Sequence, residues 1–219
     1  MDAISTLDGA RVPGFEAVVS AGAKDVAIFA SPSESFSLSN INCTIEESLL
    51  RYRAVATAAK EHSVPIRGYV SCVVGCPVEG AVPPSKVTYV VKELYDMGCF
   101  EISLGYVVPM LEAVMAIVPA EKLDVHFHDT YGQALANILV SLQMGINIVD
   151  SSIAGLGGCP DAKGASGNVA TEDVVYMLNG LGTQTNVDLG KLIAAGDSSA
   201  STSAVPTVPR LRLPSTVGS

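Results

Sequence analysis

The chain has 219 residues, enough for one domain with a substantial core, and 16% of its residues are charged at a mean hydropathy of +0.39. Such an apolar composition is typical of elements buried on more than one side, as in parallel sheets. The net charge of −9, without a basic run, argues against a nucleic-acid partner. Gly, Pro or a charge interrupts every apolar run, so no membrane span is expected.

The cysteines form an odd set that lies mostly in apolar, strand-like runs: Cys43, Cys72, Cys76, Cys99 and Cys159. A reduced compartment fits this usage better than a disulfide framework. The first residues contain one Arg and two Asp and lack an apolar core, so neither an Arg-rich transit peptide nor a secretory signal is visible.

Short β-rich runs alternate with longer helical patterns, which indicates βαβ units and an α/β fold class. The strand candidates are residues 26–30, 66–73, 100–104, 123–127 and 146–151. Thr44 and Glu47 form a possible capping box ahead of one helix. Apolar residues at three-to-four spacing predict helices around residues 45–55, 87–94, 108–118 and 135–142.

About five βα units are visible, whereas a closed (β/α)₈ barrel needs eight strands and typically about 250 residues. We therefore expect residues 1–196 to form a TIM-barrel type domain that is incomplete or has an open sheet. From Asp197 onward the chain is rich in Ser, Thr and Pro without periodicity, so residues 197–219 are expected to be a disordered tail. The alternative is that residues 205–213 pack on the body as an extended arm.

The sharpest local signal is Val125-His126-Phe127-His128-Asp129, because side chains two apart on a strand point to the same side and can reach one ion. A lone His is more often structural, but a His-x-His pair at the C-terminal end of a strand predicts a metal site. Imidazoles alone do not identify the metal. Asp129 has an alternative role as the cap of the next helix, and His62 is expected to be solvated.

A glycine-rich loop, Ala154 to Pro160, directly follows the last strand candidate. Gly155, Gly157 and Gly158 let this loop move, and Cys159 at its tip has the chemistry of a nucleophile, proton donor or redox sensor. The other cysteines are expected to be small fillers of the core or loops. The alternative is a tight strand-to-helix connection with Cys159 packed beneath it.

A third segment of small residues, Gly164 to Asn168, precedes a helix start at Thr171 with acidic residues in the first turn. The amide oxygen of Asn168 is a possible metal ligand. By itself, however, an Asn beside a Gly near a helix start is more often a turn or cap residue.

These segments together resemble the signature of 3-hydroxy-3-methylglutaryl-CoA (HMG-CoA) lyases, in the same order along the chain: His126 to Gln133, Ser152 to Pro160, and Gly164 to Asn168. Similarity spans residues 13 to 196 and includes four further stretches: Phe15 to Gly22, Asn40 to Ser48, Arg67 to Pro77 and Cys99 to Gly105. The chain looks most like the C-terminal part of such a lyase.

The resemblance implies a metal-dependent (β/α)₈-barrel enzyme that cleaves HMG-CoA to acetyl-CoA and acetoacetate, in leucine degradation and ketone-body formation. It implies a divalent cation, Mg or Mn, held by His126, His128 and Asn168, with His126 and Cys159 assisting proton transfer. Such a cation lowers the pKa of the substrate hydroxyl, while a positioned acid protonates the leaving enolate. An acyl-CoA partner and a mitochondrial location are implied as well.

The chain departs from the family pattern at several positions. The family has an Arg-Asp pair on its first strand, but Arg11 and Asp8 do not form such a dipeptide, so neither role is transferred. After Gly105 the family continues with an aspartate and a glycine-rich loop, whereas here Tyr106 follows. Asp161 stands where the family carries an aromatic residue. These departures predict a truncated or alternatively spliced form with little turnover.

Two other interpretations compete with this one. An acyl-CoA condensing enzyme, such as isopropylmalate or homocitrate synthase, shares the His-x-His barrel site, but the Gly157-Gly158-Cys159-Pro160 loop argues against it. A non-catalytic fragment would instead bind metal, assemble as a homo-oligomer, or bind a full-length subunit through an exposed sheet edge.

Overall fold

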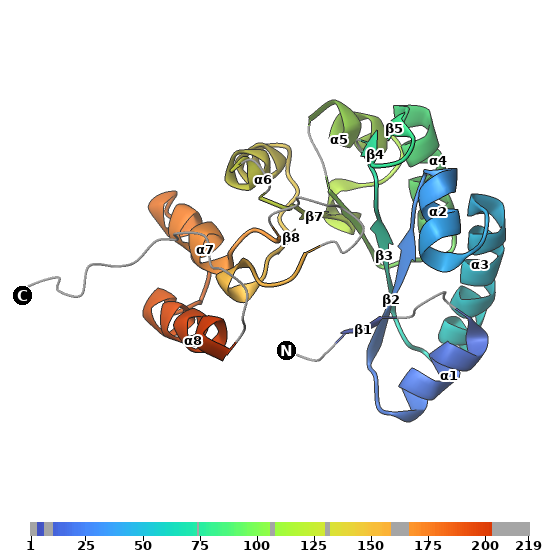
Figure 1. The fold of residues 1–219 in the computed structure, drawn as a ribbon, viewed down its shortest axis with the longest axis horizontal. Helices are drawn as coiled ribbons and strands as arrows, with labels where there is room; N and C mark the ends of the chain where they lie inside the picture. Colours follow the sequence, from blue (N-terminus) through green and yellow to red (C-terminus); the bar gives the residue numbers. More distant parts are fainter. Residues whose placement is uncertain are drawn as a thin grey trace, which may run out of the picture. The chain divides into compact units, whose positions relative to one another are not determined.

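The computed structural model of the chain describes residues 4–6, 11–73, 75–105, 108–129, 132–158 and 167–202 (Figure 1). It divides into two compact units. The first unit comprises residues 1–126 and 140–149, and the second comprises residues 127–139 and 150–219. Each unit has its own set of candidate functional residues.

The main sheet is built from six strands in the order β1 (Ile4–Thr6), β2 (Asp25–Ala30), β3 (Ile66–Val70), β6 (Glu101–Leu104), β7 (Leu123–His126) and β8 (Val149–Asp150). The pairs from β1 to β7 are parallel. A separate antiparallel hairpin joins β4 (Gly75–Cys76) to β5 (Gly80–Ala81). The order of the main sheet is linear, so among the described residues β1 and β8 are edge strands and the barrel is open.

The first unit covers its sheet with helices, in the order α1 (Val12–Ser20), α2 (Glu34–Ile41), α3 (Ile45–Glu61), α4 (Pro84–Asp96) and α5 (Val108–Met115), with a short 3₁₀ turn η1 (Ala120–Lys122) before β7. Helix α3 contacts β2, and α4 contacts β3 and β6. Figure 1 shows α1 and α3 alongside β2.

Alternation along the strands separates two faces of the sheet. The face toward the helices is apolar and buried: Val26, Ile28, Ala30, Ile66, Val70, Ile102, Leu104, Leu123 and Val125. Helix α4 meets this face with its own buried apolar stripe, which is Val87, Val90, Val91 and Leu94. The opposite face, called the inner face below, carries polar and aromatic residues: Phe29, Arg67, Tyr69, Glu101, Ser103, Asp124 and His126.

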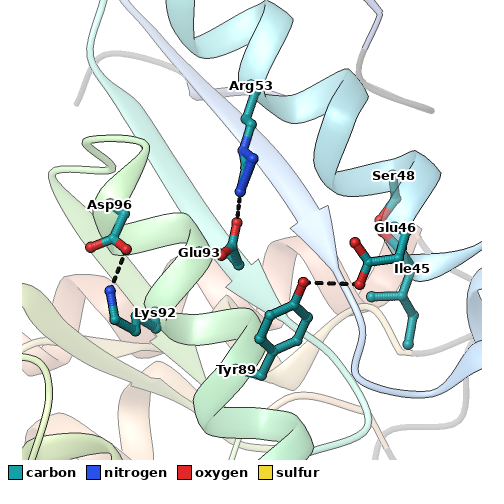
Figure 2. Close-up of polar contacts among 8 residues, drawn as sticks. All are labelled: Ile45, Glu46, Ser48, Arg53, Tyr89, Lys92, Glu93 and Asp96. Atoms are coloured by element: carbon teal, nitrogen blue, oxygen red, sulfur yellow. Dashed lines mark hydrogen bonds and ion pairs between the residues drawn. The ribbon is translucent and has the colours of Figure 1, made fainter.

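Exposed polar side chains of α3 and α4 form hydrogen bonds and ion pairs, as Figure 2 shows. The Tyr89 hydroxyl donates to Glu46 Oε1 at 2.9 Å, and this bond raises the pKa of Tyr89. Arg53 pairs with Glu93 across the two helices. Exposed pairs of this kind contribute about 0 to 1 kcal/mol. The attachment of these helices therefore rests on their apolar stripes.

The capping box predicted at Thr44 is present at the start of α3. Thr44 Oγ1 accepts from the Glu47 N–H at 3.2 Å, and the Thr44 N–H donates to Glu47 Oε2 at 2.9 Å. Hydrogen bonds from the Thr44 N–H and from the Thr44 hydroxyl lower the pKa of Glu47, and the bond from the N–H has the larger effect.

The second unit contains the 3₁₀ turn η2 (Ile153–Gly155), α7 (Thr171–Gly180) and α8 (Leu189–Thr202), while α6 (Ala134–Gln143) passes from this unit into the first. Helices α7 and α8 contact each other, and both contact η2. Among the described residues, no helix combines the length and the apolar character that a membrane span requires.

The α/β fold of an open, incomplete TIM-barrel type is confirmed, and each strand candidate corresponds to a strand: β2, β3, β6, β7 and β8. The predicted helices correspond to α3, α4, α5 and α6, and the helix start predicted at Thr171 is that of α7, whereas α1, α2, β1 and the β4–β5 hairpin were not predicted.

The expected boundary at residue 196 falls inside α8, so disorder from Asp197 to Thr202 is corrected to helix. Contacts with η2 and α7 hold α8, and extending an existing helix adds one backbone hydrogen bond for each residue fixed. Residues 203–219, including the possible arm 205–213, lie outside the described residues.

Candidate functional site

A buried ion cluster lies on the inner face of the first unit. Arg67 on β3 stands opposite Glu101 on β6, and its Nε lies 2.7 Å from Glu101 Oε1. The same guanidinium pairs with Asp124 on β7, whose side chain is fully buried. Three neighbouring strands are thus linked through one arginine. The planar fork of a guanidinium suits such a shared role.

An aromatic pair connects this cluster to the end of β7. The Arg67 guanidinium carbon lies 4.9 Å from the centroid of the Tyr69 ring, within cation–π range. Tyr69 stacks on Phe29 with centroids 4.8 Å apart and meets the His126 ring edge-on at 6.3 Å. His126, the last residue of β7, is therefore packed against a ring that is itself held on two sides.

Gly105, which follows β6, allows a close approach of two backbones in the same unit. A Cβ atom at this position would lie only 2.9 Å from the His126 carbonyl oxygen. A side chain there would push against the backbone at His126, so the residue after β6 must be glycine.

In the second unit, two short backbone segments run antiparallel and place His128 opposite Asn168 in an isolated bridge. The Val169 N–H donates to the Phe127 carbonyl at 3.1 Å, and the Asp129 N–H donates to the Gly167 carbonyl at 3.0 Å. Residues 40 positions apart in the sequence are thereby neighbours, and both are among the predicted metal ligands.

The side-chain amide of Asn168 is oriented by the glycine-rich loop. Its Nδ2 donates to the Leu156 carbonyl at 2.9 Å, and its backbone N–H donates to the Gly157 carbonyl at 3.3 Å. Asn168 does not cap α7, because the N-cap residue of that helix is Ala170. The alternative prediction that Asn168 caps the helix is therefore wrong.

The glycine-rich loop bends through a series of left-handed backbone conformations, at Ala154, Gly155 and Gly157. Gly167, which faces it, has φ +95, and a Cβ there would lie 2.5 Å from the Gly157 carbonyl oxygen. The two segments can approach this closely only because position 167 has no side chain.

Sequence reasoning did not single out Glu172, a buried carboxylate that contacts the glycine-rich loop. This side chain lies in the first turn of α7, is 7% exposed, and accepts from the Ala154 N–H with both carboxylate oxygens at 3.0 Å. The only sequence signal was an acidic residue at a helix start, which is ordinarily a solvated complement to the helix dipole.

Several predicted roles were alternatives that the structure decides. Asp129 Oδ1 accepts from the N–H of Ala134, the first residue of α6, at 3.0 Å, so Asp129 does cap this helix. His62 is exposed, as expected, and its Nδ1 lies 2.8 Å from the Ala58 carbonyl oxygen. Arg11 is the residue before α1.

The four described cysteines are free thiols, and all but the half-buried Cys72 are buried: Cys43, Cys76 and Cys99. Burial raises the pKa of Cys99 to about 12, which keeps it an unreactive thiol. Burial also opposes ionisation of Cys76, but hydrogen bonds, chiefly from Ser33, prevail and lower its pKa. Buried filler roles hold for three of these residues.

Residues 159–166, including Cys159 and Asp161, lie outside the described residues, as do Asp8 and Tyr106. Within the described ranges, no three His, Cys, Asp or Glu side chains gather closely enough to hold a metal ion. The predicted ligand set is of a different kind, because the amide of Asn168 is one of its members.

The HMGL-like family model matches residues 1–198. The mitochondrial hydroxymethylglutaryl-CoA lyase of Arabidopsis thaliana is 83% identical over 213 residues, and the cytoplasmic HMG-CoA lyase of Danio rerio is 58% identical over 196. These matches cover 90% and 85% of the chain, respectively. The chain spans only 46% of the Arabidopsis relative and 58% of the Danio relative.

A solved HMG-CoA lyase from Acinetobacter baumannii, in complex with coenzyme A and 3-methylmalate, has a similar fold, with a TM-score of 0.84 and 28% identity. The similarity covers 92% of this chain and 68% of that one. Fold, sequence and the ordered motifs agree: the chain belongs to the HMGL-like family.

Proposed function

We propose that the chain carries the metal site and the acyl-CoA chemistry of an HMG-CoA lyase, which cleaves HMG-CoA to acetyl-CoA and acetoacetate. The observation that carries this proposal is the bridge between His128 and Asn168. It brings an imidazole and an amide together from distant parts of the sequence, beside the glycine-rich loop that the family motif includes.

The donor set fits a divalent cation. Because Asn168 Nδ2 is engaged by the Leu156 carbonyl, the amide oxygen is the end left for a ligand. Imidazole nitrogen and amide oxygen together suit Mn, and the oxygen suits Mg. His126, His128 and Asn168 would hold the cation. When bound, it would supply the positive charge that lowers the pKa of the substrate's tertiary hydroxyl.

The side chains then have distinct tasks in the proposed cleavage. His126, packed against Tyr69, assists removal of the proton from the tertiary hydroxyl. As the new carbonyl forms, the carbon–carbon bond breaks and its electron pair moves to the acetyl-CoA enolate. Cys159 donates a proton to that enolate, and acetoacetate is released. The acyl-CoA class of substrate is supported by the coenzyme A bound to the Acinetobacter relative.

Location and assembly follow from other observations. We propose a mitochondrial location from the Arabidopsis relative, with the cytoplasmic Danio lyase as the competing precedent. A second candidate function, a non-catalytic chain that binds another lyase subunit or its own copy, is favoured by the open order of the described sheet. The lyase relatives give no support to a condensing enzyme.

Acetoacetate release from HMG-CoA, measured with purified protein in the presence of MnCl₂ or MgCl₂, tests the proposal. We expect a low turnover that stops when the metal is chelated, and a loss of about 10² to 10⁴-fold in His126→Ala, because this variant loses a proposed metal ligand that also assists proton transfer. His62→Ala, at an exposed histidine, is the matched control and should retain wild-type turnover. A folded protein that binds Mn²⁺ but releases no acetoacetate would instead support the non-catalytic candidate.

A further inference from the structure

Glu172 is a buried carboxylate with no part in the proposed chemistry. Both of its oxygens accept from one backbone N–H, that of Ala154, at 3.0 Å. A buried carboxylate is expensive to desolvate and is retained where its hydrogen bonds hold something in place. What it holds here is the start of the glycine-rich loop.

Ala154 is held in an unfavourable conformation. Its φ of 54 and ψ of 17 lie in the left-handed region, which a residue with a Cβ atom avoids by about 1 kcal/mol or more. This conformation therefore depends on surrounding contacts. One of them is the hydrogen bond that the Ala154 N–H donates to the Glu172 carboxylate.

The same loop contacts Asn168 through Leu156 and Gly157, two and three residues after Ala154. The carbonyls of Leu156 and Gly157 accept from the side-chain and backbone N–H groups of Asn168, respectively. A shift of the backbone at Ala154 would move these carbonyls, and the amide that is anchored to them would turn.

Helix α8 closes the other side of the carboxylate. A Cβ atom at Gly196 would lie 2.4 Å from Glu172 Oε1 and 3.6 Å from Ile153 Cγ2. The buried Gly196 thus lets α8 pack directly over the carboxylate and restrict its movement.

We propose that Glu172 is a positioning residue that sets the side-chain amide of Asn168 for the divalent cation, acting through the loop from Ala154 to Gly157. Gly196 on α8 packs against the carboxylate and restricts its movement. The link to a cation rests on the proposed function, whereas the link from Glu172 to Asn168 stands on the hydrogen bonds.

Two variants perturb the carboxylate from different sides. Glu172→Ala removes it, and Gly196→Ala leaves it intact but displaces it. Glu172→Gln retains one acceptor oxygen and should give an intermediate, partly rescued result. Asp173→Asn is the control, because it removes a charge from the same helical turn and leaves the Glu172 carboxylate in the sequence. Circular dichroism verifies folding of each variant.

Three readouts follow the chain of contacts: NMR hydrogen exchange of the Ala154 N–H, exchange of the Asn168 side-chain amide protons, and the Kd for Mn²⁺ from isothermal titration calorimetry. In Glu172→Ala and Gly196→Ala we expect faster exchange at both sites and a Kd weakened about 10 to 100-fold, as for other residues that orient a ligand. Asp173→Asn should retain wild-type values.

Faster exchange at Ala154 alone, with Asn168 exchange and the Mn²⁺ Kd unchanged, would overturn the positioning role. Unchanged exchange at Ala154 would overturn it as well. If the wild-type protein binds no Mn²⁺, the proposed metal site fails, yet the two exchange rates still decide whether Glu172 positions Asn168. A failure of the function and a failure of the inference are therefore distinguishable. If Glu172→Ala does not fold, Glu172→Gln and Gly196→Ala provide the same decision.

Discussion

Regular strands and side-chain charges organise the inner face of the first unit, where Arg67 links Glu101 and Asp124 across three strands. The second unit organises its candidate ligands through irregular backbone, with His128 and Asn168 joined by a bridge and by loop carbonyls. The two regions therefore have different weak points. Removal of the Asp124 charge tests the first, and addition of a methyl group at Gly167 tests the second.

The largest effect is expected at Asp124 in the first unit. Asp124→Ala leaves the Arg67 charge buried with only part of its compensation, and breaking such a pair typically lowers the free energy of unfolding by about 3 kcal/mol. Urea denaturation measures this change in the free energy of unfolding. Asp96→Ala, which removes an exposed ion pair with Lys92, is the control and should change stability by less than about 0.5 kcal/mol. Equal losses in both variants would remove the distinction between buried and exposed pairs.

A smaller loss is expected at the backbone contact of the second unit. Gly167→Ala places a Cβ atom against the Gly157 carbonyl and forces a side-chain residue into φ +95, which costs about 2 kcal/mol. Gly180→Ala, at the end of α7 with open space around its Cβ position, is the control and should be neutral or slightly stabilising. Both are measured by urea denaturation. Wild-type stability in Gly167→Ala would show that the two segments separate without consequence.

The smallest effect is expected at the capping box, where the first unit also relies on a bond between side chain and backbone. Thr44→Ala should lower the free energy of unfolding by about 1 kcal/mol. The depressed pKa of Glu47 adds a pH dependence. Its contribution is complete above the pKa of the unfolded chain and disappears as pH falls through the lower pKa of the folded state.

Thermal unfolding of wild type and Glu47→Ala across acidic pH would check this dependence. The difference between the two proteins should shrink as the pH falls, because Glu47 becomes protonated and its share of the capping box is lost. A difference that is constant with pH would show that the Thr44 hydroxyl alone makes the cap.

Features encoded by a local period were predictable from the sequence. The strands β2, β3, β6, β7 and β8 follow from short β-rich runs, the helices α3, α4, α5 and α6 from apolar spacing, and the capping box from two residues three positions apart. The antiparallel bridge could not be predicted from spacing alone, because it depends on how the segments at residues 128 and 168 meet. Family resemblance supplied that link before the structure did.

Long-range polar contacts escaped sequence reasoning. Arg67, Glu101 and Asp124 lie in segments whose apolar neighbours marked them as strands, but nothing in a strand pattern says which charges meet across the sheet. Glu172 resembled an ordinary first-turn acid, and its partner lies 18 residues earlier. The helical continuation of α8 was hidden by its Ser-rich composition, since packing rather than propensity sustains it.

The hydrogen bond from Asn168 to Leu156 has a consequence for charge selection. An aspartate has nearly the same shape and is ordinarily the stronger oxygen donor for hard cations, but at this position one of its oxygens would face the Leu156 carbonyl. Two acceptors would then repel each other where an N–H now stands. The surrounding backbone thereby discriminates between two isosteric side chains and keeps this position electrically neutral.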